Sequence, residues 1–189
     1  MKKAILAVSF GTSYPDTLQR TIAATEEMLG KTFPDWEVRR AFTSGMIIRK
    51  LQKRDGVEID TVTQAMKRLE AEGYTHVAVQ STHVMHGEEY EKMLSQLEPF
   101  RLRLRIASGE YPPGSKLPAV RELAADAGAN PNTVQRAFAE LEREGLIFTQ
   151  RTSGRFVTED PAMVNAARRA LAGQQVESYF SGMASLGYE

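Results

Sequence analysis

Polar and basic side chains gather around a short helix predicted at Pro131–Glu144. Asn130, Asn132, Thr133 and Arg136 lie at its start and on its first two turns. Amide, hydroxyl and guanidinium groups suit phosphates and base edges, and the free backbone N–H groups of a helix N-terminus suit a phosphate. The major groove of DNA is about 12 Å wide and admits one helix. The pattern therefore predicts a helix that reads duplex DNA.

Arginines before and after this helix extend the predicted DNA surface. Arg121 lies on the preceding predicted helix, where it can anchor that helix to the DNA backbone. Arg151 and Arg155 flank the tip of a predicted β-hairpin, where they can enter or straddle the minor groove, and Gly154 keeps the tip thin. Double-stranded DNA is thus the expected partner, and this binding requires no cofactor.

Structural roles compete with these functional ones. Asn130 and Thr133 are residue types that cap helices, so either can serve the helix alone. Arg136 can pair with Glu140 one turn on, as a solvated surface pair, and we assign Arg143 to such a role. The apolar residues of the same region are assigned to the core: Leu123, Val134, Phe138, Leu141 and Ile147.

The elements that position these groups form two blocks. Residues 1–100 alternate strands with helices, which predicts a three-layer α/β half-domain with a parallel sheet. The predicted strands are Lys3–Phe10, Trp36–Phe42 and His76–Gln80, and the predicted helices are Pro15–Leu29, Met46–Lys53, Thr61–Glu72 and Glu88–Leu97.

The second block follows Pro99 and has the order of a winged helix-turn-helix. It begins with a short helix at Arg101–Ala107, unless Pro99 merely kinks one longer helix. The remaining predicted elements are helices at Ala119–Ala127 and Pro131–Glu144 and strands at Leu146–Gln150 and Gly154–Thr158. We therefore expect a DNA-binding domain at residues 101–160 and an amphipathic helical tail at 161–189.

Composition excludes several classes of protein. The 189 residues contain no cysteine, which rules out disulfides, thiolate metal sites and cysteine nucleophiles, and is compatible with a cytoplasmic location. No apolar run approaches the roughly 18 residues that a membrane span needs, so no membrane partner is expected. The formal net charge is zero, but residues 101–158 hold nine Lys and Arg against six Asp and Glu. This mild excess favours DNA only if it lies on one face.

The second block resembles the GntR family of bacterial transcription regulators. The resemblance is carried without a gap by SGEYPPGSKLPAVRELAADAGANPNTVQRAFAELEREGLIFTQRTSGRFV, and the tail that follows resembles that of the YtrA-type branch. The resemblance implies a homodimer on a pseudo-palindromic operator, usually a repressor. It also implies DNA contacts at Arg121, Asn130, Asn132, Thr133, Arg136, Gly154 and Arg155.

The first block resembles the amino-terminal half of the anaerobic sirohydrochlorin cobalt chelatases. The motifs are AILAVSFGTSYPDT, VRRAFTSGMIIRKLQKRDGVEIDT and VAVQSTHVMHGEEYEKM. That family has two similar α/β halves facing a cleft, and inserts Co²⁺ into a tetrapyrrole on the route to cobalamin. In this chain the winged helix is expected where the second half, with the family's principal metal-site histidines, would begin.

The resemblance implies two candidate sets of site residues in the first block. His83 and His86 have a His-x-x-His spacing that can share one metal ion, with Glu88 and Glu89 nearby, although His86 stands where the family has proline. Ser9, Thr12 and Ser13 can hold substrate carboxylates. The alternatives are that His83 is a strand-end histidine satisfied by backbone and that His86 is an exposed loop residue.

Three hypotheses follow for the whole chain. The first is a GntR-type regulator whose first block senses a tetrapyrrole or Co²⁺, or is a passive appendage. The second is a cobalt chelatase, with a second copy of the chain supplying the facing half. The third is a damaged fusion with one working module, whether natural, engineered or an artefact of assembly.

Overall fold

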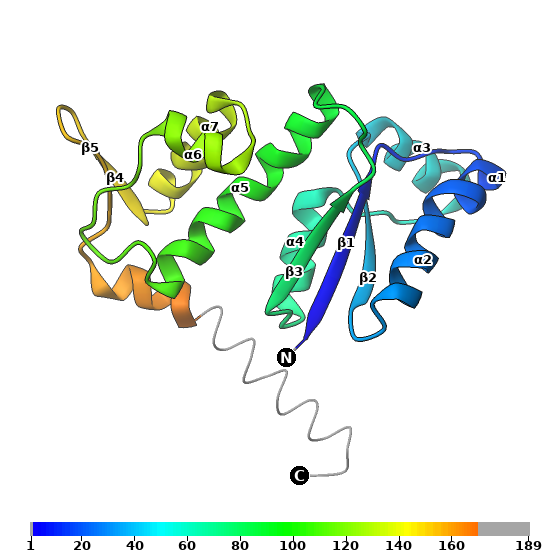
Figure 1. Ribbon diagram of the computed structural model, residues 1–189, viewed down its shortest axis with the longest axis horizontal. Helices are drawn as coiled ribbons and strands as arrows, with labels where there is room; N and C mark the ends of the chain where they lie inside the picture. Colours follow the sequence, from blue (N-terminus) through cyan, green and yellow to red (C-terminus); the bar gives the residue numbers. More distant parts are fainter. Residues whose placement is uncertain (1, 170–189) are drawn as a thin grey trace, which may run out of the picture. The chain divides into compact units, whose positions relative to one another are not determined.

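The computed structural model describes residues 2–169, and the chain divides into two compact units (Figure 1). One unit extends to Met93 and the other begins at Leu94. The division falls inside helix α5 (Glu88–Ser108), which contains Pro99. The sequence predicted a boundary at residue 100 and two helices around Pro99, so the structure selects the alternative of one longer helix.

The first unit is built on a three-stranded parallel sheet. Its strands are β1 (Lys3–Ser9), β2 (Glu37–Phe42) and β3 (His76–Ser81), in the order β2-β1-β3. In the register, Ile5 of β1 lies between Val38 of β2 and Ala78 of β3. β1 is the central strand and is buried on both faces, which explains its continuous apolar run.

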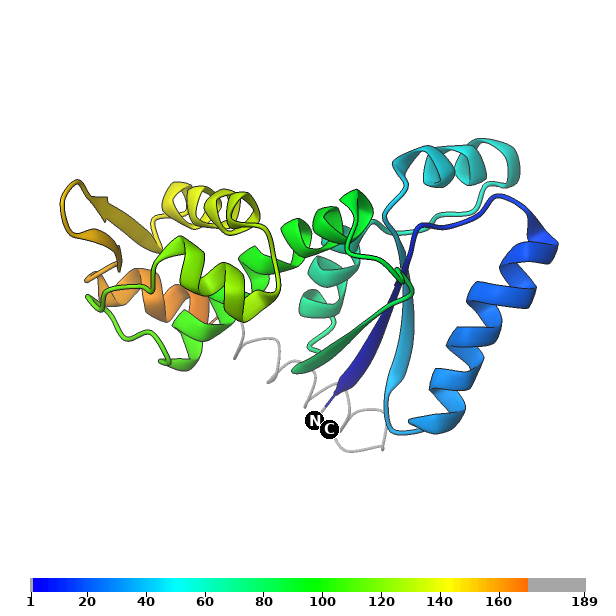
Figure 2. The same ribbon diagram turned by 45° about the horizontal axis from the view of Figure 1, so that its top comes forward.

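Helices lie on both faces of this sheet, but most residues of the edge strand β3 stay exposed. α1 (Pro15–Leu18), a π-helix η1 (Gln19–Ala23) and α2 (Ala24–Thr32) connect β1 to β2, whereas α3 (Gly45–Asp55) and α4 (Val62–Ala71) connect β2 to β3. Figures 1 and 2 show α2 and α4 on opposite faces of the sheet. Right-handed crossovers that run in opposite directions along a sheet require this arrangement. The predicted three-layer α/β half-domain is confirmed.

The helix predicted at Pro15–Leu29 is interrupted by the π-helical turn. The Thr21 and Thr25 hydroxyls each donate to the carbonyl oxygen four residues earlier, over 2.6 and 2.9 Å. Hydroxyl groups that bond to these carbonyls compete with the helical backbone bonds and distort a helix.

The second unit has the order and core of a winged helix. After α5 come α6 (Val120–Ala127), α7 (Pro131–Arg143) and the antiparallel hairpin of β4 (Ile147–Gln150) and β5 (Gly154–Val157), visible in Figure 2. One cluster of buried side chains joins these elements: Leu102, Ile106, Leu117, Leu123, Val134, Phe138, Leu141, Ile147 and Val157 are among its members. The predicted winged helix-turn-helix is confirmed.

The first part of the predicted tail belongs to this unit. Residues 161–169 are helical, and Val164 is 1% exposed in the cluster. The Arg168 Nε donates to the Ala107 carbonyl oxygen over 2.9 Å. The rest of the predicted tail, residues 170–189, lies outside the described residues, so its dimerising role stays a prediction.

Candidate functional site

The predicted reading helix α7 begins where the sequence placed it. Gly128 adopts a φ of +60° and ends α6, and Asn130 then caps α7. The Asn130 side-chain oxygen accepts from the Asn132 N–H over 2.9 Å. Asn130 therefore has the capping role that the sequence offered as an alternative, which leaves a DNA contact by its amide as a prediction.

The two faces of α7 differ in chemistry. Val134, Ala137, Phe138 and Leu141 are buried, whereas Asn132, Gln135, Arg136 and Ala139 are exposed. Thr133 is only 6% exposed, although the sequence placed it among the DNA contacts. The contact of Thr133 with DNA stays a prediction.

Arg136 does not form the surface pair with Glu140 that the sequence allowed. Among residues 2–169, no acidic group lies within ion-pair distance of its guanidinium. Glu140 instead lies 3.9 Å from Arg103 of α5. The Arg136 charge thus stays available on the exposed face of α7.

The hairpin places its two arginines in different surroundings. Arg151 is exposed at the tip, and Gly154 has a φ of +107°, a conformation that side chains rarely adopt. Arg155 is half-buried, and its guanidinium carbon lies 4.8 Å from the centre of the Phe138 ring. Arg155 therefore links the hairpin to the reading helix, in addition to its predicted contact with DNA.

Positive charge in the second unit is neutralised on α5. Arg101 and Arg105 both contact Asp126, over 2.5 and 3.0 Å, and Arg103 contacts Glu144 over 2.8 Å. The pKa of Arg105 is raised above its usual value, mainly by its hydrogen bond to Glu110. These three guanidinium groups therefore link α5 to α6 and to the end of α7, and their charges are already neutralised.

The cations without an acidic partner lie elsewhere in the unit. In the described part of the chain, Arg121 of α6, Arg136 and Arg143 of α7 and Arg151 of the hairpin are exposed and form no ion pair. The surface pair that the sequence assigned to Arg143 is therefore not formed. Lys116, which the sequence reasoning missed, shares these properties. The sequence gave little indication of a role for Lys116, because this residue lies outside the predicted helices and strands. The positive charges of the second unit that remain without an acidic partner thus lie on α6, on α7 and at the hairpin.

The loop after β1 gathers the three predicted hydroxyl residues at the carboxyl edge of the first unit's sheet. Ser9 and Ser13 are 4% and 3% exposed, and the Thr12 hydroxyl accepts from the Tyr14 N–H over 3.2 Å. Gly11 between them has a φ of +96°, and a Cβ there would overlap the Phe42 ring. Among the residues described, the buried Ser9 Oγ has no hydrogen-bond partner.

His83 is held at the same edge by two hydroxyl groups. Its Nδ1 lies 2.9 Å from the Ser81 Oγ, and its Nε2 lies 3.4 Å from the Thr43 Oγ1. Burial lowers the pKa of His83, and the carboxylate of Glu89 offsets part of this shift. The sequence alternative had this imidazole satisfied by backbone groups, whereas side-chain hydroxyls fill that role.

The structure does not bring His83 and His86 into a larger ligand set. His86 is exposed and stacks on Tyr90, with ring centres 4.2 Å apart. No group of three or more His, Asp and Glu side chains between residues 2 and 169 is arranged to hold a metal ion. Metal binding by this pair stays a prediction.

Large apolar side chains are exposed in the segments that follow the three strands, with Met46 in the first turn of α3. Phe10 and Tyr14 follow β1, Met46 follows β2, and Val84 and Met85 follow β3. Val84 is 98% exposed and Met85 is 80% exposed. Large exposed apolar patches mark interaction sites, which makes this edge of the sheet a candidate binding surface.

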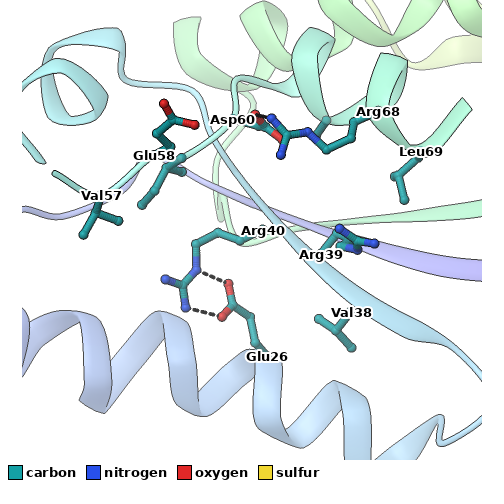
Figure 3. Close-up of a pocket in the computed structure, with 11 residues that line it drawn as sticks. Glu26, Val38, Arg39, Arg40, Val57, Glu58, Asp60, Arg68 and Leu69 are labelled. Atoms are coloured by element: carbon teal, nitrogen blue, oxygen red, sulfur yellow. Dashed lines mark hydrogen bonds and ion pairs between the residues drawn. The ribbon is translucent and has the colours of Figure 1, made fainter. Parts of the chain in front are cut away.

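A pocket in the first unit lies away from both candidate sites. It measures about 350 Å³ and lies between α2, β2, α4 and the segment 57–60 (Figure 3). Arginines and carboxylates in its wall neutralise one another: Arg40 Nε donates to Glu26 over 2.7 Å, and Arg68 lies 3.1 Å from Asp60. None of the predicted site residues lines this pocket.

None of the helices in the described part of the chain is both long and apolar enough to cross a membrane.

Comparison with known families divides the chain in the same way. The sequence model of the family "Cobalt chelatase (CbiK)" matches residues 3–106. The sequence model of "Bacterial regulatory proteins, gntR family" matches residues 100–157.

Individual relatives agree with these two matches. The sirohydrochlorin cobaltochelatase of Salmonella typhimurium is 54% identical over 101 residues, which are 53% of this chain and 38% of the relative. The uncharacterized HTH-type transcriptional regulator YhcF of Bacillus subtilis is 39% identical over 83 residues, 44% of this chain and 69% of the relative. The HTH-type transcriptional repressor YtrA of the same organism is 46% identical over 71 residues, 38% of this chain and 51% of the relative. The chain thus spans little more than a third of the cobaltochelatase.

Proposed function

Because its residues 3–106 belong to the cobalt chelatase (CbiK) family and its residues 100–157 to the gntR family of bacterial regulatory proteins, we propose that this chain is a sequence-specific, DNA-binding transcription regulator of the cytoplasm. The distribution of charge in the second unit carries the proposal. The α5 arginines are neutralised, whereas the exposed cations of α6, α7 and the hairpin are not. This leaves positive charge on the three elements that contact DNA in a winged helix.

The residues have different roles in the proposed complex. Asn132 and Arg136 read base edges in the major groove from the exposed face of α7. Arg121, Arg151 and Arg155 bind the phosphate backbone or the minor groove, and Gly154 allows the hairpin tip to approach closely. The protein acts as a homodimeric repressor on a pseudo-palindromic operator and needs no cofactor to bind it.

The proposal is tested by selecting a preferred duplex and measuring affinity across a series of salt concentrations. Specific binding that weakens steeply between low and physiological salt is expected. Arg136→Ala should relax base preference at one position, at a cost of about 1–3 kcal/mol, whereas Arg121→Ala should weaken all sequences similarly. The matched control is Arg20→Ala, which removes an exposed arginine of the first unit. An unchanged base preference in Arg136→Ala would show that α7 is not the reading helix.

A second function is favoured by the carboxyl edge of the first unit. We propose that the exposed apolar residues there cover one face of a tetrapyrrole, and that the buried Ser9 Oγ and the loop N–H groups hold its carboxylates. Cobalt insertion needs imidazole and carboxylate groups to guide the ion and accept pyrrole protons. His83 is the candidate here, and a second copy of the chain would supply the facing half.

This second function is tested by absorbance. Tetrapyrrole binding and cobalt insertion are followed separately in the full chain and in His83→Ala. Binding without insertion would identify the first unit as a sensor. If no insertion occurs at any concentration at which the protein dimerises, the chelatase proposal is refuted.

A further inference from the structure

Residues 114–117 run alongside β5 and are joined to it by backbone hydrogen bonds and one isolated antiparallel bridge. The Leu117 N–H donates to the Arg155 carbonyl oxygen over 2.8 Å, and Lys116 pairs with Phe156 in an antiparallel bridge. The backbone of this segment is therefore fixed along β5, although it precedes β5 by almost forty residues in the sequence.

This pairing places Lys116 on the outer face of the hairpin. Paired residues in an antiparallel ladder share a face, and neighbours along a strand point to opposite faces. Arg155 points toward Phe138 of α7, so Phe156 and its partner Lys116 lie on the other face. From there the lysine reaches the hairpin tip. A Cβ added to Gly154 would lie 3.2 Å from the Lys116 Cε and 4.0 Å from its Nζ.

The Lys116 ammonium group is exposed and its charge is not neutralised. No acidic side chain of the described chain forms an ion pair with it. It is also the last lysine in the sequence, since every later cation is an arginine. A backbone that is hydrogen-bonded to β5 thus presents a second exposed positive charge near the hairpin tip, beside that of Arg151.

We propose that Lys116 binds a DNA phosphate and so fixes the outer face of the hairpin to the DNA backbone. This inference rests on the proposed DNA-binding function. An ammonium group is a compact, strongly hydrated point charge, which suits a phosphate and lacks the planar geometry that recognises a base pair bidentately. Lys116 therefore contributes affinity for every sequence and no base preference.

Gly154 has a second role under this proposal. A side chain at this position is strained by the φ of +107°, and its Cβ would come so close to the Lys116 Cε that the lysine side chain would have to shift by a few tenths of an ångström. A glycine at position 154 leaves room for the Lys116 side chain at the hairpin tip. Gly154→Ala is therefore expected to weaken DNA binding through both effects.

The test compares Lys116→Gln, Lys116→Arg and the control Lys67→Gln, which removes an exposed lysine of the first unit. For each full-length protein, affinity for the selected duplex and for an unrelated duplex is measured against salt concentration. In Lys116→Gln, the slope of log affinity against log salt should fall by about 1, with base preference unchanged. Lys116→Arg and Lys67→Gln should keep the wild-type slope. Thermal unfolding verifies that the exposed substitutions leave the fold intact.

The outcomes separate this inference from the function on which it rests. If the wild-type protein binds no duplex, the proposed function and the inference are both overturned. If the wild-type protein binds and Lys116→Gln keeps its full salt slope, only the role of Lys116 is overturned. A changed base preference in Lys116→Gln would also overturn it, because a phosphate contact carries no sequence information.

Discussion

Arg155 combines two roles in one side chain. Its guanidinium lies over the ring of Phe138, which is 1% exposed in the core of the second unit. Its position on β5, near the hairpin tip, is also one of the predicted minor-groove contacts. A planar cation stacked on a ring is worth about 0.5–2 kcal/mol, depending on how far it is desolvated. The residue thus connects the fold to the function.

Substitution should separate these roles. Arg155→Ala is expected to lower the free energy of unfolding by about 1 kcal/mol and to weaken DNA binding. Arg155→Lys keeps the charge but loses the planar stack, so it should retain most of the salt dependence while losing stability. Thermal unfolding and a salt series on the selected duplex measure the two effects. Arg151→Ala, at the exposed tip, is the control and should keep its stability. Equal stability of Arg155→Ala and the wild type would contradict a structural role for the stack.

His83 predicts a pH dependence in the first unit. Its pKa is lowered by burial, so the folded state binds fewer protons than the unfolded state at mildly acidic pH. The free energy of unfolding should therefore fall as the pH drops below the unfolded-state pKa of about 6.5, and the loss should end below the folded-state pKa. Protonation would also force both ring nitrogens to donate to the hydroxyls of Ser81 and Thr43.

The measurement is urea unfolding at a series of pH values, followed by the fluorescence of Trp36. This is the single tryptophan of the chain, and it lies in the first unit. His83→Gln should reduce the loss of stability between neutral and acidic pH. His86→Gln controls for the removal of an imidazole from the same loop. The same pH slope in His83→Gln and the wild type would exclude His83 as its source.

At the scale of elements, α7 depends on its cap. Asn130→Ala is expected to lower the free energy of unfolding by about 1 kcal/mol, because the Asn132 N–H loses its acceptor. Asn130→Asp should keep the cap but weaken DNA binding, since it adds a negative charge where the helix approaches phosphates. Thermal unfolding and duplex affinity are measured for both variants. Unchanged stability in Asn130→Ala would contradict the capping role. Unchanged affinity in Asn130→Asp would show that DNA does not approach this turn.

Most helices and strands follow from local sequence patterns, whereas α5 does not. Strands β1 and β2 and helices α6 and α7 were predictable because apolar periodicity, glycine and capping residues agree in each. Pro99 was misleading: it removes one backbone hydrogen bond, a local cost, but Leu102 and Ile106 in the same helix are 1% and 0% exposed in the core. Burial of this kind depends on contacts distant in sequence, so it cannot be read from the local pattern.

The candidate site was predictable to a similar degree. The exposed positions of Asn132 and Arg136 follow from the helical period that buries Val134 and Phe138. Thr133 is largely buried because one helical position separates the exposed face from the buried one, and its contact with DNA stays a prediction. Lys116 was missed because its place depends on pairing with β5, which lies far along the sequence.

At the scale of the whole molecule, one helix serves both families. The two family matches overlap at residues 100–106, inside α5, and within this overlap Leu102 and Ile106 contribute to the core of the second unit. The residues that end the chelatase match therefore also provide the first helix of the winged-helix unit. The second unit thus has a buried core of its own that includes residues of the chelatase match.

The proposed homodimer predicts that the operator needs two half-sites at a fixed spacing. A winged helix reads a few base pairs, so a two-fold dimer on two half-sites about 10 base pairs apart gains both affinity and specificity. Deleting one half-site should weaken binding at least about tenfold, and inserting about half a helical turn between the half-sites should weaken it similarly, because the second reading helix then meets the wrong face of the duplex. Sedimentation of the free protein and of its complex establishes the stoichiometry. If the complex holds one chain, and a single half-site binds as tightly as two, the chain reads DNA as a monomer and the dimer is excluded.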